Sequence, residues 1–469
     1  FYNAREEDIA LRRRADVIGR NFFSEVAPCT QVREFQGRYP EALQPGASPI
    51  TFAFIFPFPG RRREVEITLS GFSREGQRMC LVAVRDVTQE RALREQLERA
   101  ERLRLAGETL PSVRPGIGIE ITREPVGVVG IVTPWNFPIA IPAWKVAPAL
   151  ACGNTVILKG SENCPRTHQL IAEAFVDAGF PPGVVNYITN APADAGAVVE
   201  AMVAHPAVRR VNFTGSTKVG KIIAMTCAKY LKPVVLELGG KAPLVILDDA
   251  NIDDAVNAAA FGSFANSGQI CMSTERIIVV DAVADAFTEK FAAKAASISA
   301  GDPREGKTPL GAVVDQKTVR HVNSLIDDAT SKGANVIAGG KAESVVMPAT
   351  VVDGVTAAMD LYTDESFGPI VAIIRARDAE HAVELANDSH YGLSAAVFTR
   401  DIVLGLAIAR RIQSGICHIN GPTVHDEPQM PFGGVGASGH GRFGGRQGID
   451  SFTETRWITI ETQPGHFPI

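Results

Sequence analysis

The strongest constraint on the fold is a series of short apolar runs that alternate with amphipathic helical segments after residue 126. The first five runs are 126–132, 155–158, 184–188, 210–213 and 234–237. A helical pattern over 170–178, which ends at Gly179, lies between two of them. Apolar strands joined by amphipathic helices are typical of a parallel sheet covered on both faces. We therefore predict an α/β fold, and the runs 242–247 and 276–280 predict a second α/β domain.

The composition is that of a globular chain of two or three domains. Of 469 residues, 45% are hydrophobic and 21% are charged, and the net charge is −5. This charge offers no general basic surface for nucleic acid, and no apolar run reaches the roughly 20 residues that span a bilayer. The seven cysteines form no CxxC pair and no cluster at metal-ligand spacing. We expect a reduced cytoplasmic protein without nucleic acid, membrane or metal partners.

The first 105 residues follow a different pattern. Runs 52–58 and 64–69 alternate as half-buried strands do, and 79–84 is a third strand candidate. These three runs predict a small antiparallel sheet. Leu93 and Leu97 then recur at helical spacing among charged residues, which predicts a linker helix.

Cys271 is the first residue that could carry chemistry, because it follows a glycine-containing break after a helical segment. A thiol attacks only as the thiolate, so its site must supply positive potential or a base. Taken alone, a cysteine in such a chain is more often a buried apolar residue.

Two polar residues follow apolar runs, at the strand ends where open α/β sheets bind ligands. Glu237 precedes two glycines and could act as a general base, although a glutamate that caps a loop is the alternative. Asn136 lies in a proline-rich turn and could donate a hydrogen bond to an oxyanion, although ordinary turn chemistry is the alternative. In 213–220, a strand enters a glycine-bounded loop that opens a helix, which suits a pyrophosphate.

Together these segments resemble the aldehyde dehydrogenase superfamily over residues 106–469. Its motifs stand in the usual order: Pro134–Pro138, Leu158–Lys159, Ser161–Glu162, Phe213–Ser216, Leu236–Lys241, Gly268–Cys271, Glu365–Pro369 and Pro431–Gly434. The resemblance implies a Rossmann-type cofactor domain, an α/β catalytic domain and oligomerisation arms, in a homodimer or homotetramer.

The resemblance also implies roles for individual residues. Cys271 would add to the aldehyde carbonyl, Asn136 would hold the oxyanion with the Cys271 amide, and Glu237 would activate the water that hydrolyses the thioester. The cofactor would be NAD, because the Glu162 carboxylate should repel a 2′-phosphate. The implied cofactor-binding residues are Trp135, Lys159, Glu162, Gly215, Ser216, Gly220, Glu365 and Phe367. Lys159 and Glu162 would hold the adenosine ribose, Ser216 the pyrophosphate, and the last two the nicotinamide side.

The segment 419–432 resembles the salicylaldehyde, vanillin and benzaldehyde dehydrogenase branch, which implies an aromatic aldehyde. Phe137, Trp144 and Phe432 match its substrate-pocket positions and could form an aromatic slot, with core packing as the alternative for Trp144. Two features depart from the family. Gly436 stands where a lysine is usual, and another sequence replaces the residues that precede Gly107 in the family and build part of its cofactor domain.

Residues 1–88 resemble photoactive yellow protein and related PAS sensor domains. The matching segments are Tyr2–Glu6, Val17–Phe23, Val26–Thr30 and Asp86–Thr88. Cys29 matches the cysteine that carries a p-coumaroyl thioester, and Tyr2, Glu6 and Arg12 match the surrounding pocket, whereas Ala10 replaces a threonine. We expect an α+β PAS-like domain that lacks its opening strands.

These resemblances predict the order of the domains. It runs from a PAS-like domain (1–88) and a linker helix (89–105) to an oligomerisation hairpin (106–126), an NAD-binding domain (127–237), a catalytic domain (238–437), a return to the NAD-binding domain (438–450), and an arm with a tail (451–469). The alternative function is a PAS-type sensor or interaction protein whose dehydrogenase part is inactive, because the front of the cofactor domain is replaced.

Overall fold

The computed structural model describes residues 35–58, 61–74, 77–87, 108–114, 116–306 and 308–461. The chain divides into two compact units, Phe1–Arg102 and Leu103–Ile469. The predicted linker helix and the predicted chromophore pocket, which comprises Cys29, Tyr2, Glu6 and Arg12, lie outside the described residues.

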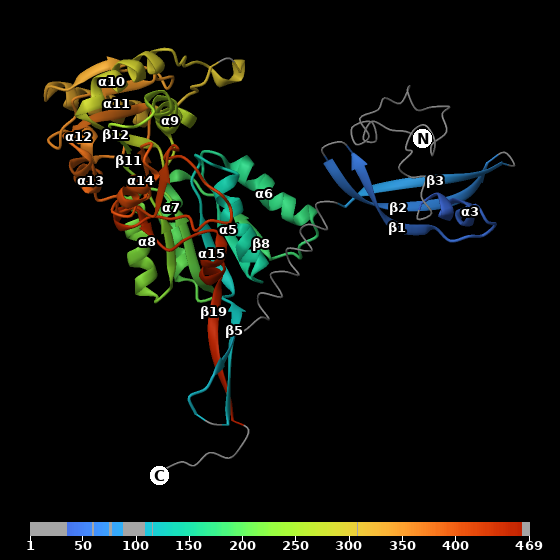
Figure 1. Cartoon of the computed structure of the whole chain (residues 1–469). Coiled ribbons are helices and arrows are strands. Elements are labelled where there is room, and N and C mark those ends of the chain that lie inside the picture. The colour runs from blue at the N-terminus through green and yellow to red at the C-terminus, as the bar shows by residue number, and fades with distance from the viewer. Residues whose placement is uncertain are drawn as a thin grey trace, which may run out of the picture. The chain divides into compact units, whose positions relative to one another are not determined.

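The first unit contains a three-stranded antiparallel sheet in the order β1-β2-β3 (Figure 1). Its elements are η3 (Gln36–Arg38), α3 (Tyr39–Ala42), β1 (Ile50–Phe58), β2 (Arg61–Arg74) and β3 (Gln77–Asp86). Val65, Ile67 and Leu69 alternate along β2 and are fully buried in one core with Phe35 and Ala42. This period of two confirms the predicted antiparallel sheet, because alternate residues of a strand face the same side.

The first sheet of the second unit has the order β18-β10-β9-β6-β7-β8 and is parallel except for β18. Its strands are β6 (Val128–Val132), β7 (Thr155–Lys159), β8 (Val185–Ile188), β9 (Val208–Thr214), β10 (Val234–Glu237) and β18 (Gly439–His440). Its connections contain α5 (Ala140–Ala151), α6 (Pro165–Asp177), η4 (Pro192–Asp194), α7 (Ala195–Ala204) and α8 (Thr217–Lys229). Ile131 and Val132 bury their side chains in two separate clusters, so both faces are covered and the predicted parallel sheet is confirmed.

The second sheet of this unit has seven strands in the order β13-β14-β15-β12-β11-β16-β17, and only β13 is antiparallel to its neighbour. The strands are β11 (Ala242–Ile246), β12 (Thr274–Val280), β13 (Asn335–Ala338), β14 (Thr350–Asp353), β15 (Ile370–Ala376), β16 (Ser394–Phe398) and β17 (Ile416–Ile419). The helices are α9 (Ile252–Phe264), η5 (Ala265–Gly268), α10 (Asp281–Ala296), η6 (Pro303–Glu305), α11 (Gln316–Ser331), α12 (Asp360–Thr363), α13 (Ala379–Asn387) and α14 (Ile402–Ala409). Val245 and Ile246 again enter different clusters, which confirms the second α/β layer.

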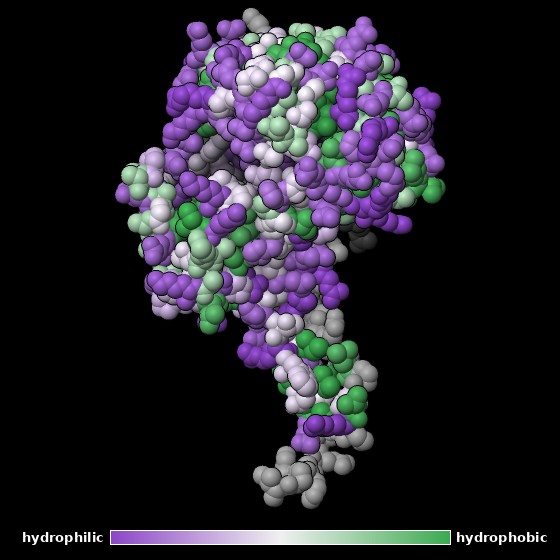
Figure 2. All heavy atoms as spheres, turned by 90° about the vertical axis from the view of Figure 1, so that its left-hand side faces the viewer, coloured by the Kyte–Doolittle hydropathy of each residue, from purple (hydrophilic) through white to green (hydrophobic). Residues whose placement is uncertain are grey.

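A third, antiparallel sheet projects from the body of the second unit in the order β19-β5-β4 (Figure 1). It consists of β4 (Glu108–Pro111), β5 (Ile117–Pro125) and β19 (Thr453–Glu461), and β19 follows η7 (Gly436–Ser438) and α15 (Gly445–Phe452). Apolar groups gather on this arm in Figure 2, and Trp457 is 70% exposed. Such exposed apolar surface is typical of an interface between protein chains.

Candidate active site

The loop that carries Cys271 leaves helix α9 through three consecutive left-handed residues. Asn266, Ser267 and Gly268 have φ values of 50°, 55° and 72°. A left-handed conformation costs a residue with a side chain roughly 1–2 kcal/mol, and such strain is concentrated at functional sites. The Ser273 hydroxyl stabilises the loop by donating to the Gly268 carbonyl at 3.1 Å.

Glu237 lies at the end of β10, beside Cys271, and each group perturbs the other. Burial, and then the negative charge of Glu237, raise the pKa of the Cys271 thiol well above its usual value. Burial also raises the pKa of Glu237, while Cys271 and Lys145 oppose that shift. Glu237 Oε1 is buried and accepts no hydrogen bond from the described part of the chain. A thiol therefore faces a carboxylate that has capacity to take a proton.

Lys145 is a buried cation of the site that sequence reasoning missed. It lies on α5, and its Nζ donates to Asn212 Oδ1 at 2.6 Å and stands 3.8 Å from the centre of the Phe443 ring. Burial lowers its pKa to about 7, although the charge of Glu237 acts in the opposite direction. A lysine inside the apolar stretch 139–150 was the signal in the sequence, because a charge there must have buried partners.

Asn136 links the turn after β6 to the cysteine loop. Its Nδ2 donates to the Gln269 carbonyl at 3.0 Å, and Asn266 Nδ2 donates to the Asn136 carbonyl at 3.2 Å. The Asn136 amide therefore contacts a residue that stands two positions before Cys271, and it keeps a second N–H for another acceptor.

Glu365 and Phe367 lie on the turn before β15. The Gly240 amide donates to Glu365 Oε1 at 2.8 Å, and burial raises the pKa of this carboxyl to about 8. Phe367 takes a left-handed φ of 46° and packs edge-to-face on Trp135, with 5.8 Å between ring centres. The structure thus brings three of the predicted cofactor residues onto neighbouring loops.

The remaining predicted cofactor residues follow β7 and β9. Lys159 Nζ lies 3.5 Å from Glu162 Oε2. Ser216 is exposed at the N-terminus of α8 and accepts a hydrogen bond from the Val219 amide. A Cβ on Gly220 would lie 2.4 Å from Leu238, so this glycine allows α8 to pack closely against the end of β10. A Cβ on Gly215 would likewise lie 2.5 Å from the Phe213 ring.

Aromatic side chains border Cys271 on one side. Phe137, Trp144 and Cys271 are partly buried against a cluster that includes Phe432. The Trp144 and Phe432 rings have centres 5.4 Å apart. One cluster therefore contains both the rings and the thiol, so Trp144 packs in the same cluster as Cys271.

Gly436, the departure from the family, adopts a φ of 60°, and a Cβ there would lie 2.7 Å from the His390 carbonyl oxygen. The segment remains tied to the site, because the Ser438 hydroxyl donates to the Gly239 carbonyl at 2.7 Å. The glycine thus permits a tight local turn without displacing the loop after Glu237.

Within the ranges that the structure describes, no helix has the length and apolar content needed to cross a membrane. The same ranges contain no group of three or more His, Cys, Asp or Glu side chains that could hold a metal ion.

Residues 75–458 match the sequence profile of the aldehyde dehydrogenase family. The vanillin dehydrogenase of Pseudomonas fluorescens is 54% identical over 363 residues, which cover 77% of this chain and 75% of that protein. The chain belongs to the aldehyde dehydrogenase family. The NAD(+) benzaldehyde dehydrogenase of Pseudomonas putida is 43% identical over 364 residues, which cover 77% of this chain and 74% of that protein.

Among solved structures, the dehydrogenase unit is similar to a salicylaldehyde dehydrogenase from Pseudomonas putida G7 in complex with salicylaldehyde. The TM-score is 0.78 at 45% identity, and the match covers 80% of this chain and 78% of the other. Residues 1–92 separately match the profile of the PAS fold. Both resemblances drawn from the sequence are confirmed, as is the α/β fold class.

Proposed function

We propose that this aldehyde dehydrogenase oxidises an aromatic aldehyde to the carboxylic acid with NAD, and that Cys271 is the nucleophile. The observation that supports it most is that Glu237, at the end of β10, lies beside the Cys271 thiol, while the Asn136 amide donates to the cysteine loop at Gln269. A nucleophile, a base and an oxyanion donor must share one space for acyl chemistry. Relatives named for vanillin and benzaldehyde are 54% and 43% identical to this chain in sequence.

The donors at the strand ends fit NAD. The Lys159–Glu162 pair offers a cation and a carboxylate for a ribose diol, and Ser216 with the N-terminus of α8 suits a pyrophosphate. The Thr133 hydroxyl, after β6, is buried and has no hydrogen-bond partner among the described residues. When bound, NAD supplies the acceptor for the hydride that leaves the aldehyde carbon. Glu365 and Phe367 would contact the nicotinamide side.

The side chains of the site account for the remaining chemistry. The thiol proton of Cys271 passes to Glu237 as sulfur adds to the aldehyde carbonyl, and the free Asn136 Nδ2–H and the Cys271 amide stabilise the oxyanion. Glu237 then gives this proton up to solvent. After oxidation leaves a thioester, the Glu237 carboxylate takes a proton from water, which attacks the acyl carbon. The acid is released, and the proton returns to the Cys271 sulfur. The buried Lys145 cation stabilises the carboxylate between these steps.

The ring cluster supports an aromatic substrate. Phe137, Trp144 and Phe432 can hold a flat ring by edge and face contacts beside the thiol. An oligomer is also proposed, a homodimer or homotetramer, since the projecting sheet leaves Trp457 and Ile460 exposed.

The test is aldehyde-dependent formation of NADH by the purified chain, with benzaldehyde, vanillin and salicylaldehyde as substrates. Cys271→Ala should abolish it. Cys227→Ala is the matched control, because this thiol is buried in the core of the cofactor sheet, and its activity should stay within about two-fold of wild type. Absence of NADH with every aromatic and aliphatic aldehyde, from a folded protein, would refute the proposal. Failure of the same folded protein to bind NAD in a titration would favour the sensor alternative.

A further inference from the structure

Glu275 is a buried carboxylate that none of the proposed chemical steps uses. It is the second residue of β12, four positions after Cys271, and is 3% exposed. It accepts hydrogen bonds from the Ser366 amide at 3.0 Å, from the Ser366 hydroxyl at 2.8 Å and from the Phe367 amide at 3.3 Å. All three donors lie on the turn that carries Glu365 and Phe367.

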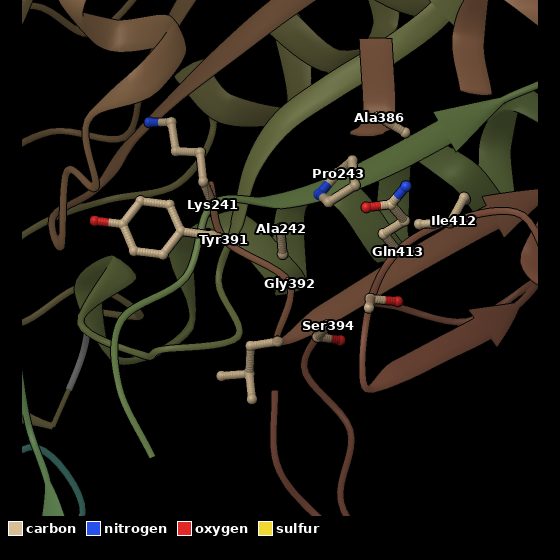
Figure 3. Close-up of a pocket in the computed structure, with 11 residues that line it drawn as sticks. Lys241, Ala242, Pro243, Ala386, Tyr391, Gly392, Ser394, Ile412 and Gln413 are labelled. Atoms are coloured by element: carbon tan, nitrogen blue, oxygen red, sulfur yellow. The ribbon is translucent and has the colours of Figure 1, made fainter. Parts of the chain in front are cut away.

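Lys241 completes this buried cluster from the other side. Its Nζ donates to Glu275 Oε2 at 2.7 Å and to the Asp364 carbonyl at 2.5 Å, and its side chain is fully buried. Lys241 also borders a small pocket with Tyr391, and in Figure 3 its side chain points away from Pro243 and Ser394, which border the same pocket. A buried cation and a buried anion that are paired and hydrogen-bonded to the backbone constrain geometry more than they add stability.

The turn that these two residues hold lies between regular elements. Residues 364–369 separate α12 from β15, and the sheet reaches only the end of this segment, where the Pro369 carbonyl accepts from the Thr350 amide of β14 at 2.8 Å. His321 Nε2 donates to the Glu365 carbonyl at 2.9 Å and adds one further tether. Phe367 has a left-handed backbone, a conformation that persists only where surrounding contacts impose it. Glu275 supplies such a contact directly, through the Phe367 amide.

The same turn packs against the cysteine loop without intervening side chains. A Cβ on Gly268 would lie 2.0 Å from the Gly368 carbonyl oxygen, and one on Gly239 would lie 2.3 Å from Glu365 Oε2. At Gly268 the contact is with the backbone of the turn, so a displacement of the turn there reaches the cysteine loop directly.

We propose that Glu275, paired with Lys241, is a positioning residue that sets the conformation of the 364–367 turn and so places Glu365 and Phe367 against the nicotinamide side of the cofactor. This inference rests on the proposed use of NAD by the site. Glu275 itself touches neither substrate nor cofactor. Its first effect is on cofactor affinity, because the Glu275 side chain contacts the turn and not the Cys271 thiol, although Glu365 on that turn also raises the pKa of the thiol.

The variant Glu275→Gln tests the inference, because the amide keeps the shape but cannot accept from all its present donors and leaves Lys241 without a counter-ion. We expect the Kd for NAD, measured by calorimetric titration, to rise about ten-fold, the effect of losing one set of charge-assisted hydrogen bonds. Alkylation of Cys271 by iodoacetamide without cofactor should change much less than the rise of about ten-fold in Kd, because the Glu275 side chain contacts the turn and not the thiol. Ser366→Ala removes only the hydroxyl bonds and should raise the Kd in the same direction by about three-fold.

Asp249→Asn is the matched control. Asp249 also holds a turn, through the Thr399 hydroxyl at 2.8 Å and the Arg400 and Asp401 amides. This turn lies at the other edge of the sheet, because Asp249 follows β11, whereas Cys271 precedes the parallel strand β12. It should lower the melting temperature and leave the Kd for NAD unchanged. The inference fails if Glu275→Gln and Ser366→Ala bind NAD as wild type does, or if alkylation falls in parallel with NAD affinity. If wild type itself binds no NAD, the proposed function fails and this inference with it.

Discussion

Replacement of Gly268 by alanine tests the packing of the cysteine loop against the turn before β15. The new Cβ would lie 2.0 Å from the Gly368 carbonyl oxygen and 2.5 Å from its carbon, at a backbone φ of 72°. Both contacts are with backbone atoms, so no side-chain rotation relieves them. Contacts below 3.0 Å are not tolerated, so the loop or the turn must move by about 1 Å.

Two costs follow from this geometry. The left-handed conformation costs alanine about 1 kcal/mol relative to glycine, and the forced displacement adds about 1–3 kcal/mol, as overpacking does elsewhere. A displacement of about 1 Å at reacting atoms lowers catalysis by about 100-fold. We therefore expect Gly268→Ala to lose about 2–4 kcal/mol of unfolding free energy and about 100-fold in kcat/KM.

Gly333→Ala separates the two costs. Gly333 follows α11 at a φ of 98°, and a Cβ there meets no atom within 4 Å. It should lose about 1 kcal/mol in urea unfolding and keep wild-type kcat/KM, as measured by NADH absorbance over a range of aldehyde concentrations. A Gly268→Ala protein with kcat/KM within about five-fold of wild type would refute the close packing of these loops.

Four further predictions concern buried charges and hydrogen bonds. Because the folded pKa of Lys145 is about 7 and its ordinary value is 10.5, the unfolded chain binds more protons between these values. Stability should therefore rise with pH across that window by up to about 1.4 kcal/mol per pH unit, and urea unfolding of Lys145→Met should lack this slope. The Arg276 guanidinium donates to the Leu385, Ala386 and Asp388 carbonyls at the end of α13. Arg276→Met should cost about 3–5 kcal/mol in urea unfolding, because these buried acceptors lose their donors, and a cost below about 1 kcal/mol would contradict their importance. Asn136→Ala should lower kcat by about 100-fold or more and leave iodoacetamide alkylation of Cys271 intact. Glu237→Gln should abolish turnover yet shift the pH midpoint of Cys271 alkylation to lower pH, because it removes a negative charge that raises the thiol pKa. An unchanged midpoint would show that the charge of Glu237 does not act on the thiol.

The strands of the cofactor sheet were predictable because their signal is local. An uninterrupted apolar run such as 155–158 indicates a strand buried on both faces, whichever strands pair with it. The structure has strand β7 at these residues. Cys271 and Glu237 were found because glycines beside them mark the tight turns on which they stand. The boundaries of the predicted domains remain predictions, as do the individual site roles.

Lys145 and Glu275 were not predictable in this way, because their surroundings come from distant parts of the chain. Asn212, which accepts from Lys145, lies 67 positions away, and Ser366 lies 91 positions from Glu275. A charged residue in an apolar segment indicates that some partner exists, but not which one. The partners of Glu275 depend on the order of the parallel strands. The seven-stranded sheet places β12, which carries Glu275, beside β15, which Ser366 precedes.

The protonation state of Cys271 in the absence of substrate depends on its own burial, on the carboxyl groups of Glu237 and Glu365, and on the Lys145 amine. Cys271, Glu237 and Glu365 all have raised pKa values, with burial as the first cause of each. Lys145, with a pKa of about 7, is only partly charged at neutral pH. Ionising the thiol there would add a negative charge to a region that already disfavours two carboxylates, so the proton stays on sulfur. The nucleophile is therefore not stored as a reactive thiolate. It forms when an aldehyde accepts the sulfur and Glu237 takes the proton, which confines the reactivity of a strained and buried loop to the moment when substrate is present.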